Sequence, residues 1–420
     1  MEFIMAVSQL FKKPLASLTL AILAIGAYQS AAAEDNFKLV LKNAFIERNY
    51  DNDSIKDPGS WSQGISGFYT SDYVPTVLTV ADKPIEIGMD ASLQYALRLS
   101  GDRHVDDTIL PFDTVSKTQD RNFLKYGGTL KLKYDKTEFK IGELWLDLPI
   151  TSTDASRQLL SSYWGGQVKS QVTDKFKVEF GRIERVSPRY EEKFHEFSYT
   201  VNGKKYFTDG LNYVDLKYDI TPNLKAEYYY GDLEDLYDKH YLGLEYWWKG
   251  QNFKSQTRLK YFRSQDSGSS QAGEVDNHNL GLLEKVFVGN HTVALGYQQL
   301  FGDTGYPLPD GFLPELYFIN WNTTGFFKKD EKSVHFLYGY DFKNYVPGLN
   351  ALVKYVHGFD FKDGQGRDNR ESETNFILGY DFQNPKLKGL SFQWLYIDYD
   401  IKNGNSFQEN RVLTTYTKKF

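Results

Sequence analysis

The chain has 420 residues, a formal net charge of −6 and no cysteine, and 16 % of its residues are aromatic although its mean hydropathy is −0.52. The lack of cysteine excludes disulfide frameworks, thiolate zinc sites and thiol nucleophiles, and the acidic balance argues against nucleic acid as a partner. After the N-terminal leader, no apolar run reaches the roughly 18 residues of a transmembrane helix, so membrane insertion would require a closed β-barrel, which also pairs every backbone group.

The first 33 residues have the pattern of a secretory signal peptide. Lys12 and Lys13 precede the apolar run "PLASLTLAILAIGAY", which leads to three consecutive alanines. This pattern predicts cleavage before Glu34, whereas the alternative, a retained membrane anchor, would need a longer apolar run. The leader carries two lysines and one glutamate, so its removal changes the net charge from −6 to −7. The remainder, 34–420, is predicted to form a single exported domain.

Apolar and polar residues alternate along most of the remaining chain. In "NFLKYGGTLKLKY", Leu130 and Leu132 share one face while Lys131 and Lys133 share the other, as in a strand between lipid and a wet lumen. Most of these segments are near the 9–11 residues that cross a membrane as tilted strands, and bacterial barrels have even strand numbers. The eighteen predicted strands are about 36–50, 62–70, 86–99, 122–134, 137–146, 164–173, 176–186, 211–220, 223–232, 240–249, 252–263, 277–288, 291–302, 332–343, 349–361, 372–383, 389–400 and 409–420.

The connections between these strands alternate in length from residue 122 onward, as expected for short periplasmic turns and long external loops. The short ones are 135–136, 174–175, 221–222, 250–251, 289–290, 344–348 and 384–388. The long ones are 147–163, 187–210, 264–276, 303–331, 362–371 and 401–408, with 233–239 the shortest of that set. Segment 71–85 is longer than this rule predicts for a turn. The sequence therefore predicts an all-β, transmembrane, antiparallel β-barrel; a soluble all-β protein would not need so many aromatic residues on its strand faces.

A barrel of eighteen strands is wide enough for an aqueous lumen. No plug domain precedes the first strand of the predicted mature chain, so only loops that fold inward could narrow the lumen. The segment "DLPITSTDASRQLL" within 147–163 has no strand period, and 303–331 is uncommonly long. Long loops of this kind are often functional, so these two are predicted to fold into the lumen and constrict it.

Several segments together resemble the OprD-type, substrate-specific outer-membrane porins. "GELWLDLPITSTDASRQLL" with the following Gly pair is similar to the third loop of that family, and "GDTGYPLPD" to its seventh loop. "LKNAFIERNY" is similar to the first strand, "LEDLYDKHYLGLEY" to a central hairpin, and "HFLYGYDFKNYVPGLNALVKYVHG" and "ENRVLTTYTKKF" to the last strands. The final aromatic residue, Phe420, resembles the signal that barrel-assembly machinery reads.

The resemblance implies a monomeric channel for small water-soluble solutes, usually carboxylate-bearing, such as amino acids, aromatic acids and β-lactam antibiotics, which diffuse passively. It also implies a basic ladder along one lumen wall and an eyelet with an acidic group opposite. The positions that match the ladder and eyelet are Lys42, Arg48, Arg157, Lys354 and Arg411, with Asp303 as the acidic group. Further basic residues expected to face the lumen are Lys131, Lys133, Arg258 and Lys260.

The roles of these residues have alternatives. Arginine stays charged and its planar fork matches a carboxylate, so Arg157 could meet the passing solute or pair with Asp147 or Asp154 and brace the loop. Asp303 could be a turn residue within "GDTG", and the lumen lysines could simply be solvated. Two arginines that the family tends to carry are replaced here by Gln393 and Leu395. This departure favours neutral or aromatic solutes over a strict preference for carboxylates.

Other functions on a barrel scaffold fit the sequence less well. None of the seven histidines lies in an H-E-x-x-H motif or beside a G-x-S-x-G elbow, which argues against a barrel enzyme. A transporter of hydrophobic solutes or an adhesin is the other alternative, but the inward positions are Lys, Glu, Gln and Asp. The sequence indicates no cofactor and no metal site. The expected surroundings are lipid and lipopolysaccharide of a Gram-negative outer membrane.

Overall fold

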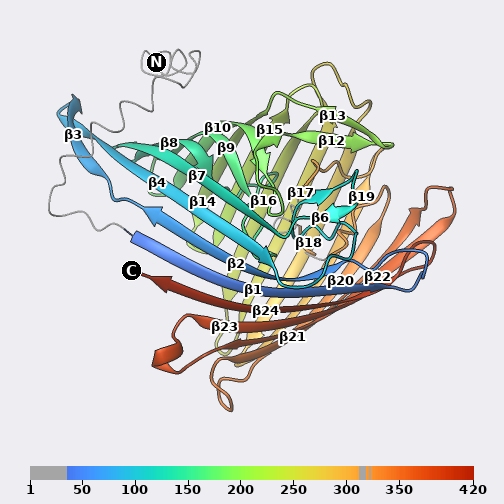
Figure 1. The fold of residues 1–420 in the computed structure, drawn as a ribbon. Helices are drawn as coiled ribbons and strands as arrows, with labels where there is room; N and C mark the ends of the chain where they lie inside the picture. The colour runs from blue at the N-terminus through green and yellow to red at the C-terminus, as the bar shows by residue number, and fades with distance from the viewer. Residues whose placement is uncertain (1–35, 312–317, 321–322) are drawn as a thin grey trace.

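The computed structural model describes residues 36–311, 318–320 and 323–420, and within them eighteen antiparallel strands form one closed wall (Figure 1). Every wall strand pairs with its neighbour in sequence, and β1 pairs with β24 from Lys38–Lys419 to Tyr50–Phe407, which closes the barrel. The prediction of an 18-stranded barrel is confirmed. The predicted signal peptide, 1–33, lies outside the described residues.

The strands of the wall agree with the predicted segments to within a few residues. They are β1 (Asn36–Tyr50), β2 (Gly59–Thr70), β4 (Lys83–Arg98), β7 (Asn122–Tyr134), β8 (Thr137–Leu144), β9 (Ser162–Gln171), β10 (Phe176–Ser187), β14 (Leu211–Thr221), β15 (Leu224–Leu233), β16 (Tyr237–Lys249), β17 (Lys254–Asp266), β18 (Asp276–Val288), β19 (His291–Phe301), β20 (Lys332–Asp341), β21 (Leu349–Lys362), β22 (Asp368–Asp381), β23 (Leu390–Ile401) and β24 (Phe407–Lys419). One 3₁₀ turn, η2 (Pro385–Leu387), lies between β22 and β23. Helices long and apolar enough to cross a membrane are absent from the described ranges.

The alternation in the sequence places apolar side chains on the outside of the wall. Leu282, Leu295, Phe336 and Tyr355 are exposed there, on strands whose alternate residues are buried in the lumen. In water such a surface would be unfavourable, but it matches the hydrocarbon core of a bilayer, while closure leaves no unpaired edge. The period of two therefore determines which residues can line the channel.

The connection 71–85, which its length and composition predict to be an extended turn, contains another strand, β3 (Val74–Val80). It forms a hairpin with the first residues of β4, with Val80 opposite Lys83. Ala81 and Asp82 make its turn with φ of 46° and 61°, the left-handed pair of a tight hairpin turn. Figure 1 shows β3 at the same end of the barrel as the C-terminus.

Small strands also occur within the long loops. They are β5 (Phe112–Asp113), β6 (Thr118–Gln119), β11 (His195–Glu196), β12 (Ser198–Val201) and β13 (Lys204–Phe207). Two loops are shorter than predicted, because β21 and β22 are separated only by 363–367 and β23 and β24 only by 402–406. We call the end of the barrel that carries these loops the long-loop end and the opposite end the short-turn end.

Loop 147–163 folds into the lumen, as predicted. A Cβ at Gly64 of β2 would lie 2.6 Å from the Gln158 carbonyl oxygen, and a Cβ at Gly231 of β15 would lie 2.8 Å from Ile150 Cδ1. β2 and β15 each lie three strands from the hairpin strands that carry the loop, on opposite sides. The loop therefore spans the lumen, and glycines at two contact points leave room for it.

One sector of the lumen is filled by a hydrophobic cluster beneath this loop. Leu148 and Ile150 of the loop pack with tyrosines and other apolar residues that project inward from β14 to β17, including Tyr213, Tyr229 and Phe262. Apolar and aromatic side chains that face a water-filled lumen are unfavourable. Packing of the loop against the wall removes these side chains of both from water. The remaining open lumen lies toward β1 and β22 to β24.

Candidate functional site

The open part of the constriction is a cavity of about 720 Å³ between the inward loops and one wall. Loop 147–163 contributes Ala155, Ser156 and Arg157, and the segment after β10 contributes Arg189 and Tyr190. The wall side is formed by β1 and by β22 to β24. From loop 303–331, Gly311 and Thr323 also line the cavity. We call this space the constriction cavity.

All five charged residues that line the constriction cavity, among the residues the structure describes, are basic. They are Lys42, Arg48, Arg157, Arg189 and Arg411. Lys42 and Arg48 lie six residues apart on β1, which is roughly 20 Å along a strand. The structure therefore brings together four of the six predicted ladder and eyelet residues and adds Arg189.

Two wall arginines are oriented by one buried carboxylate. Glu409 of β24, whose side chain is 2 % exposed, pairs with Arg48 through Nε at 2.7 Å and also with Arg411. The Arg48 guanidinium lies 4.0 Å from the centre of the Phe407 ring, and Arg411 donates to the Thr323 hydroxyl at 3.1 Å. Guanidinium groups fixed in this way remain positioned to meet a carboxylate in the cavity.

The loop side of the cavity is held by separate contacts. Lys42 donates to the Ala155 carbonyl at 2.6 Å, and Arg157 donates to the Ser156 carbonyl at 3.2 Å. Asp154, one of the two partners considered for Arg157, forms a buried ion pair with Arg189. Burial, with the nearby Glu191 carboxylate, raises the pKa of Tyr190 to about 12, so its hydroxyl stays protonated and can donate at neutral pH.

An apolar stripe interrupts the polar wall of the constriction cavity. Ile377, Leu395 and Leu413 all line it, and Ile377 lies opposite Leu395 in the pairing of β22 with β23. Leu395 is also directly opposite Arg411, and Gln393 lies opposite Leu413. Gln393 and Leu395, where the resemblance implies arginines, thus both line the cavity, one as an amide and one as part of an apolar surface beside an arginine.

Lys354 and Asp303 lie outside the constriction cavity. Lys354 faces inward from β21, as its parity predicts, but its side chain is completely buried. Asp303, at the start of loop 303–331, is largely exposed and lies 3.9 Å from Lys329. Neither residue lines the cavity where Arg48, Arg157 and Arg411 meet.

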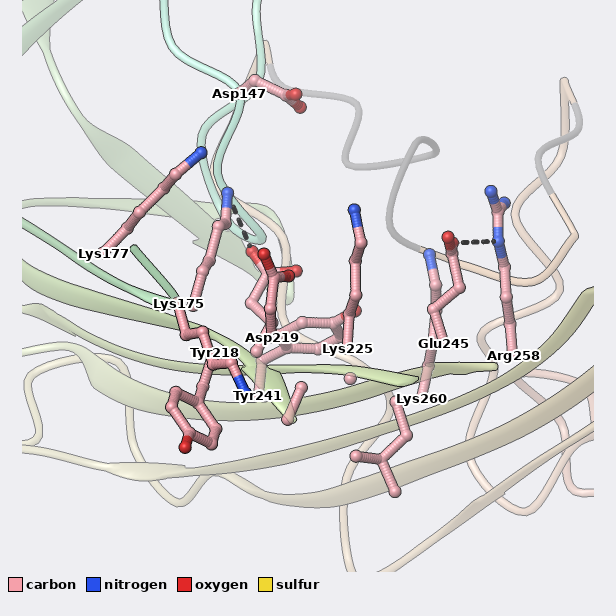
Figure 2. Close-up of a pocket in the computed structure, with 15 residues that line it drawn as sticks. Asp147, Lys175, Lys177, Tyr218, Asp219, Lys225, Tyr241, Glu245, Arg258 and Lys260 are labelled. Carbon is pink, nitrogen blue, oxygen red and sulfur yellow. Dashed lines mark hydrogen bonds and ion pairs between the residues drawn. The ribbon is translucent and has the colours of Figure 1, made fainter. Parts of the chain in front are cut away.

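The four additional basic residues divide into two pairs. Lys131 and Lys133 face inward but are engaged by acidic residues, Lys131 with Asp90 at 2.7 Å and Lys133 with Glu86 at 3.4 Å. Arg258 and Lys260 line a second cavity on the opposite wall (Figure 2).

Sequence reasoning did not identify Arg189, Tyr190 or the apolar stripe. Arg189 and Tyr190 lie in the long loop 187–210, where no period assigns a side chain to the lumen. Ile377 and Leu413 are apolar residues on lumen-facing positions, and an exception to the alternation could have revealed them. Arg189 has no such signal, because its position depends on a contact with Asp154 from another loop.

The described end of loop 303–331 is anchored to β22. Glu373 accepts hydrogen bonds from the backbone N–H groups of Thr323 and Thr324, both at 3.0 Å. Glu331 accepts from Lys328 N–H at 3.0 Å, while the Lys328 ammonium pairs with the buried Glu371. Burial, followed by the neighbouring Glu371 carboxylate, raises the pKa of Glu331 to about 9. The free carboxyl value is about 4.3, so Glu331 is protonated at neutral pH.

Because the pKa of Glu331 is raised, this residue is expected to hold the end of loop 303–331 less firmly as the pH rises. Its stabilising contribution is fully present below about pH 4.3 and is lost as the pH rises through about 9, because the folded loop disfavours the charged form. Glu331→Gln, which cannot ionise, is expected to stabilise the loop relative to the native protein, and this gain should grow as the pH rises from about 4.3 to about 9. Hydrogen exchange of 323–331, corrected for the intrinsic pH dependence, would measure this. Equal pH dependence in the native and variant proteins would contradict it.

The chain is similar to known outer-membrane proteins over most of its length. Residues 32–420 match the model of the family described as outer membrane porin, OprD family. Porin-like protein GalP of Pseudomonas putida is 26 % identical over 407 residues, covering 96 % of this chain and 95 % of that protein. Porin D of Pseudomonas aeruginosa is 26 % identical over 417 residues, covering 91 % of this chain and 90 % of that protein.

The chain is also similar to solved structures over most of its length. The crystal structure of Acinetobacter baumannii OccAB4 is 59 % identical, with a TM-score of 0.90, and the match covers 92 % of this chain and 98 % of that one. Pseudomonas aeruginosa OpdK, crystallised with vanillate, is 25 % identical, with a TM-score of 0.85, and the match covers 92 % of this chain and 99 % of that one. The chain therefore belongs to the OprD family of substrate-specific outer-membrane porins of Gram-negative bacteria.

Proposed function

We propose that this porin passes small solutes that combine a carboxylate with an apolar or aromatic body. The observation that carries the proposal is the composition of the constriction cavity, where every charged lining residue among those described is basic. Basic groups on β1, β24 and two loops offer a carboxylate successive contacts. Several moderate sites favour conduction, because a solute must bind well enough to enter and weakly enough to leave.

The apolar stripe supports the second part of the proposed substrate. Leu395 lies opposite Arg411, so a solute whose carboxylate meets Arg411 can place apolar surface against Leu395. Each apolar side chain contributes through the area that it removes from water, at about 25 cal/mol per Å². Vanillate, with which OpdK was crystallised, has this combination of an aromatic ring and a carboxylate. Aromatic acids are therefore the first solutes to test, followed by β-lactams and amino acids.

Uptake into proteoliposomes would test this function. Benzoate is expected to enter faster than benzamide, its neutral counterpart, and faster than acetate, which lacks the ring. Planar bilayers under a KCl gradient should give a reversal potential on the chloride-selective side. Equal rates for benzoate and benzamide would reject the carboxylate preference, and equal rates for benzoate and acetate would reject the role of the apolar stripe. Absence of conductance would reject the channel function itself.

A further inference from the structure

A second cavity, of about 530 Å³, lies on the wall opposite the constriction cavity. Its floor is formed by inward-facing residues of β10 and β14 to β17 near the short-turn end, and Asp147 of loop 147–163 lies above it (Figure 2). Six basic and four acidic residues line it. We call this space the short-turn pocket.

The short-turn pocket is roofed on its long-loop side. Tyr241 lines the pocket and also belongs to the buried cluster beneath loop 147–163. On β15, Tyr229 and Leu233, which follow the pocket residue Glu227 on the lumen-facing side, are completely buried, and Ile150 packs over Gly231. A solute from outside therefore cannot descend along this wall. The pocket is reached from the short-turn end or around the loop, after the constriction cavity.

Two of the four acidic residues that line this pocket, Glu227 and Glu245, are paired with basic residues that also line it. Lys217 lies 3.2 Å from both Asp215 and Glu227, and Arg258 pairs with Glu245 at 3.0 Å. Lys177 and Lys225, by contrast, are exposed side chains without a hydrogen-bond or ion-pair partner in the described part of the chain. The wall thus presents surplus positive charge.

The arrangement of the two lysines concentrates this charge. Lys177 lies directly opposite Lys217 in the pairing of β10 with β14, and like charges in that position are unfavourable for the sheet. Lys177 and Lys225 point from the wall to the same side, toward the loop that carries Asp147, as does Lys260 (Figure 2). Lys177 and Lys225 lie on next-neighbour strands, about 10 Å apart across the sheet, and are offset by two residues along it, because Lys177 aligns with Glu227 through Lys217. Two ammonium groups separated in this way suit a ligand that carries more than one anionic group.

We infer that the short-turn pocket is a second anion-binding site, which opens to the periplasm and takes compounds carrying two or more carboxylate or phosphate groups. It is distinct from the ladder of the constriction cavity, because the hydrophobic cluster beneath loop 147–163 fills the lumen above it. Lysine serves such a site as a flexible, strongly hydrated point charge that releases its ligand readily. The ligand is either a solute that has passed the constriction or an anion of the periplasm, and sided addition separates these sources.

Sided block of single channels by pyrophosphate in planar bilayers would test the site. Pyrophosphate added at the short-turn side is expected to reduce the current at lower concentration than orthophosphate does. Lys177→Gln with Lys225→Gln should raise the half-blocking concentration about tenfold from that side. Lys386→Gln with Lys388→Gln, two exposed lysines of another short turn, is the matched control and should have no effect.

Three outcomes would overturn the inference. They are block that is equal from both sides, block that the Lys177/Lys225 double variant retains unchanged, and block that the Lys386/Lys388 control removes equally. If pyrophosphate from the long-loop side also blocks and this block is lost in the double variant, the ligand is a permeating solute; loss confined to the short-turn side indicates a periplasmic anion. Ion selectivity measured in the same channels tests the proposed function independently, because it depends on the constriction cavity.

Discussion

Replacing Arg157 by glutamine is expected to slow benzoate uptake about tenfold and to shift the reversal potential toward zero, while benzamide uptake stays unchanged. Arg157 is carried by the loop that spans the lumen and lines the constriction cavity together with wall residues of β1 and β24. Two unit charges about 4 Å apart attract by roughly 1 kcal/mol in water and by about 4 kcal/mol at an effective dielectric of 20. Since about 1.4 kcal/mol corresponds to a factor of ten, tenfold is the expected scale.

The control for this experiment is Arg370→Gln. Arg370 is an exposed residue at the start of β22, outside both cavities, so this variant removes the same charge without changing the constriction cavity. Its uptake and selectivity should equal those of the native channel. If Arg157→Gln lowers benzoate and benzamide uptake equally, the arginine acts by bracing the loop. If it changes neither, the charge of Arg157 has no part in selection.

Replacing Gly64 by valine is expected to raise single-channel conductance several-fold and to remove discrimination among solutes. A Cβ at this position would lie 2.6 Å from the Gln158 carbonyl oxygen, which is backbone and cannot rotate away. Overpacking of this kind typically costs about 1–3 kcal/mol, and the closed wall, paired on both sides of β2, is harder to displace than the loop. Loop 147–163 should therefore leave its position against β2.

Gly364→Val provides the matched control, because a Cβ at Gly364 has no heavy atom of the described structure within 4 Å. Both variants should retain the heat-modifiable electrophoretic mobility of a folded barrel, so that a loss of folding is recognised separately. Native conductance and native discrimination in folded Gly64→Val would show that this contact does not hold the loop.

The sequence predicted the wall because the physical requirement behind it is local. Every residue of a barrel strand faces either lipid or the lumen. Comparing the polarity of residues two positions apart is therefore enough to recognise a strand. The β3 hairpin is not visible in this pattern. Its turn uses Ala81 and Asp82 with positive φ instead of the Asn-Gly or Asp-Gly pairs that normally indicate such a turn, and two prolines, Pro75 and Pro84, interrupt the alternation.

The sequence predicted which charged side chains point into the lumen, but it did not predict which residues they pair with. Parity on the strands correctly placed Lys131, Arg258 and Lys354 inside the barrel. It could not show that Lys131 pairs with Asp90 or that Lys354 is completely buried. Those outcomes depend on cross-strand partners and on loops that cover the wall, which lie far away in the sequence.

The sequence by itself determined a tube of eighteen strands with a wet interior and an aperiodic loop to narrow it, because each of these features is written in short-range patterns of polarity and loop length. Only the tertiary structure decided where the loop lies, because its path depends on glycines of β2 and β15 that admit it from opposite sides. That path assigns Arg189 and the apolar stripe to the constriction cavity. It also separates this cavity from the short-turn pocket, where Lys177 and Lys225 lie.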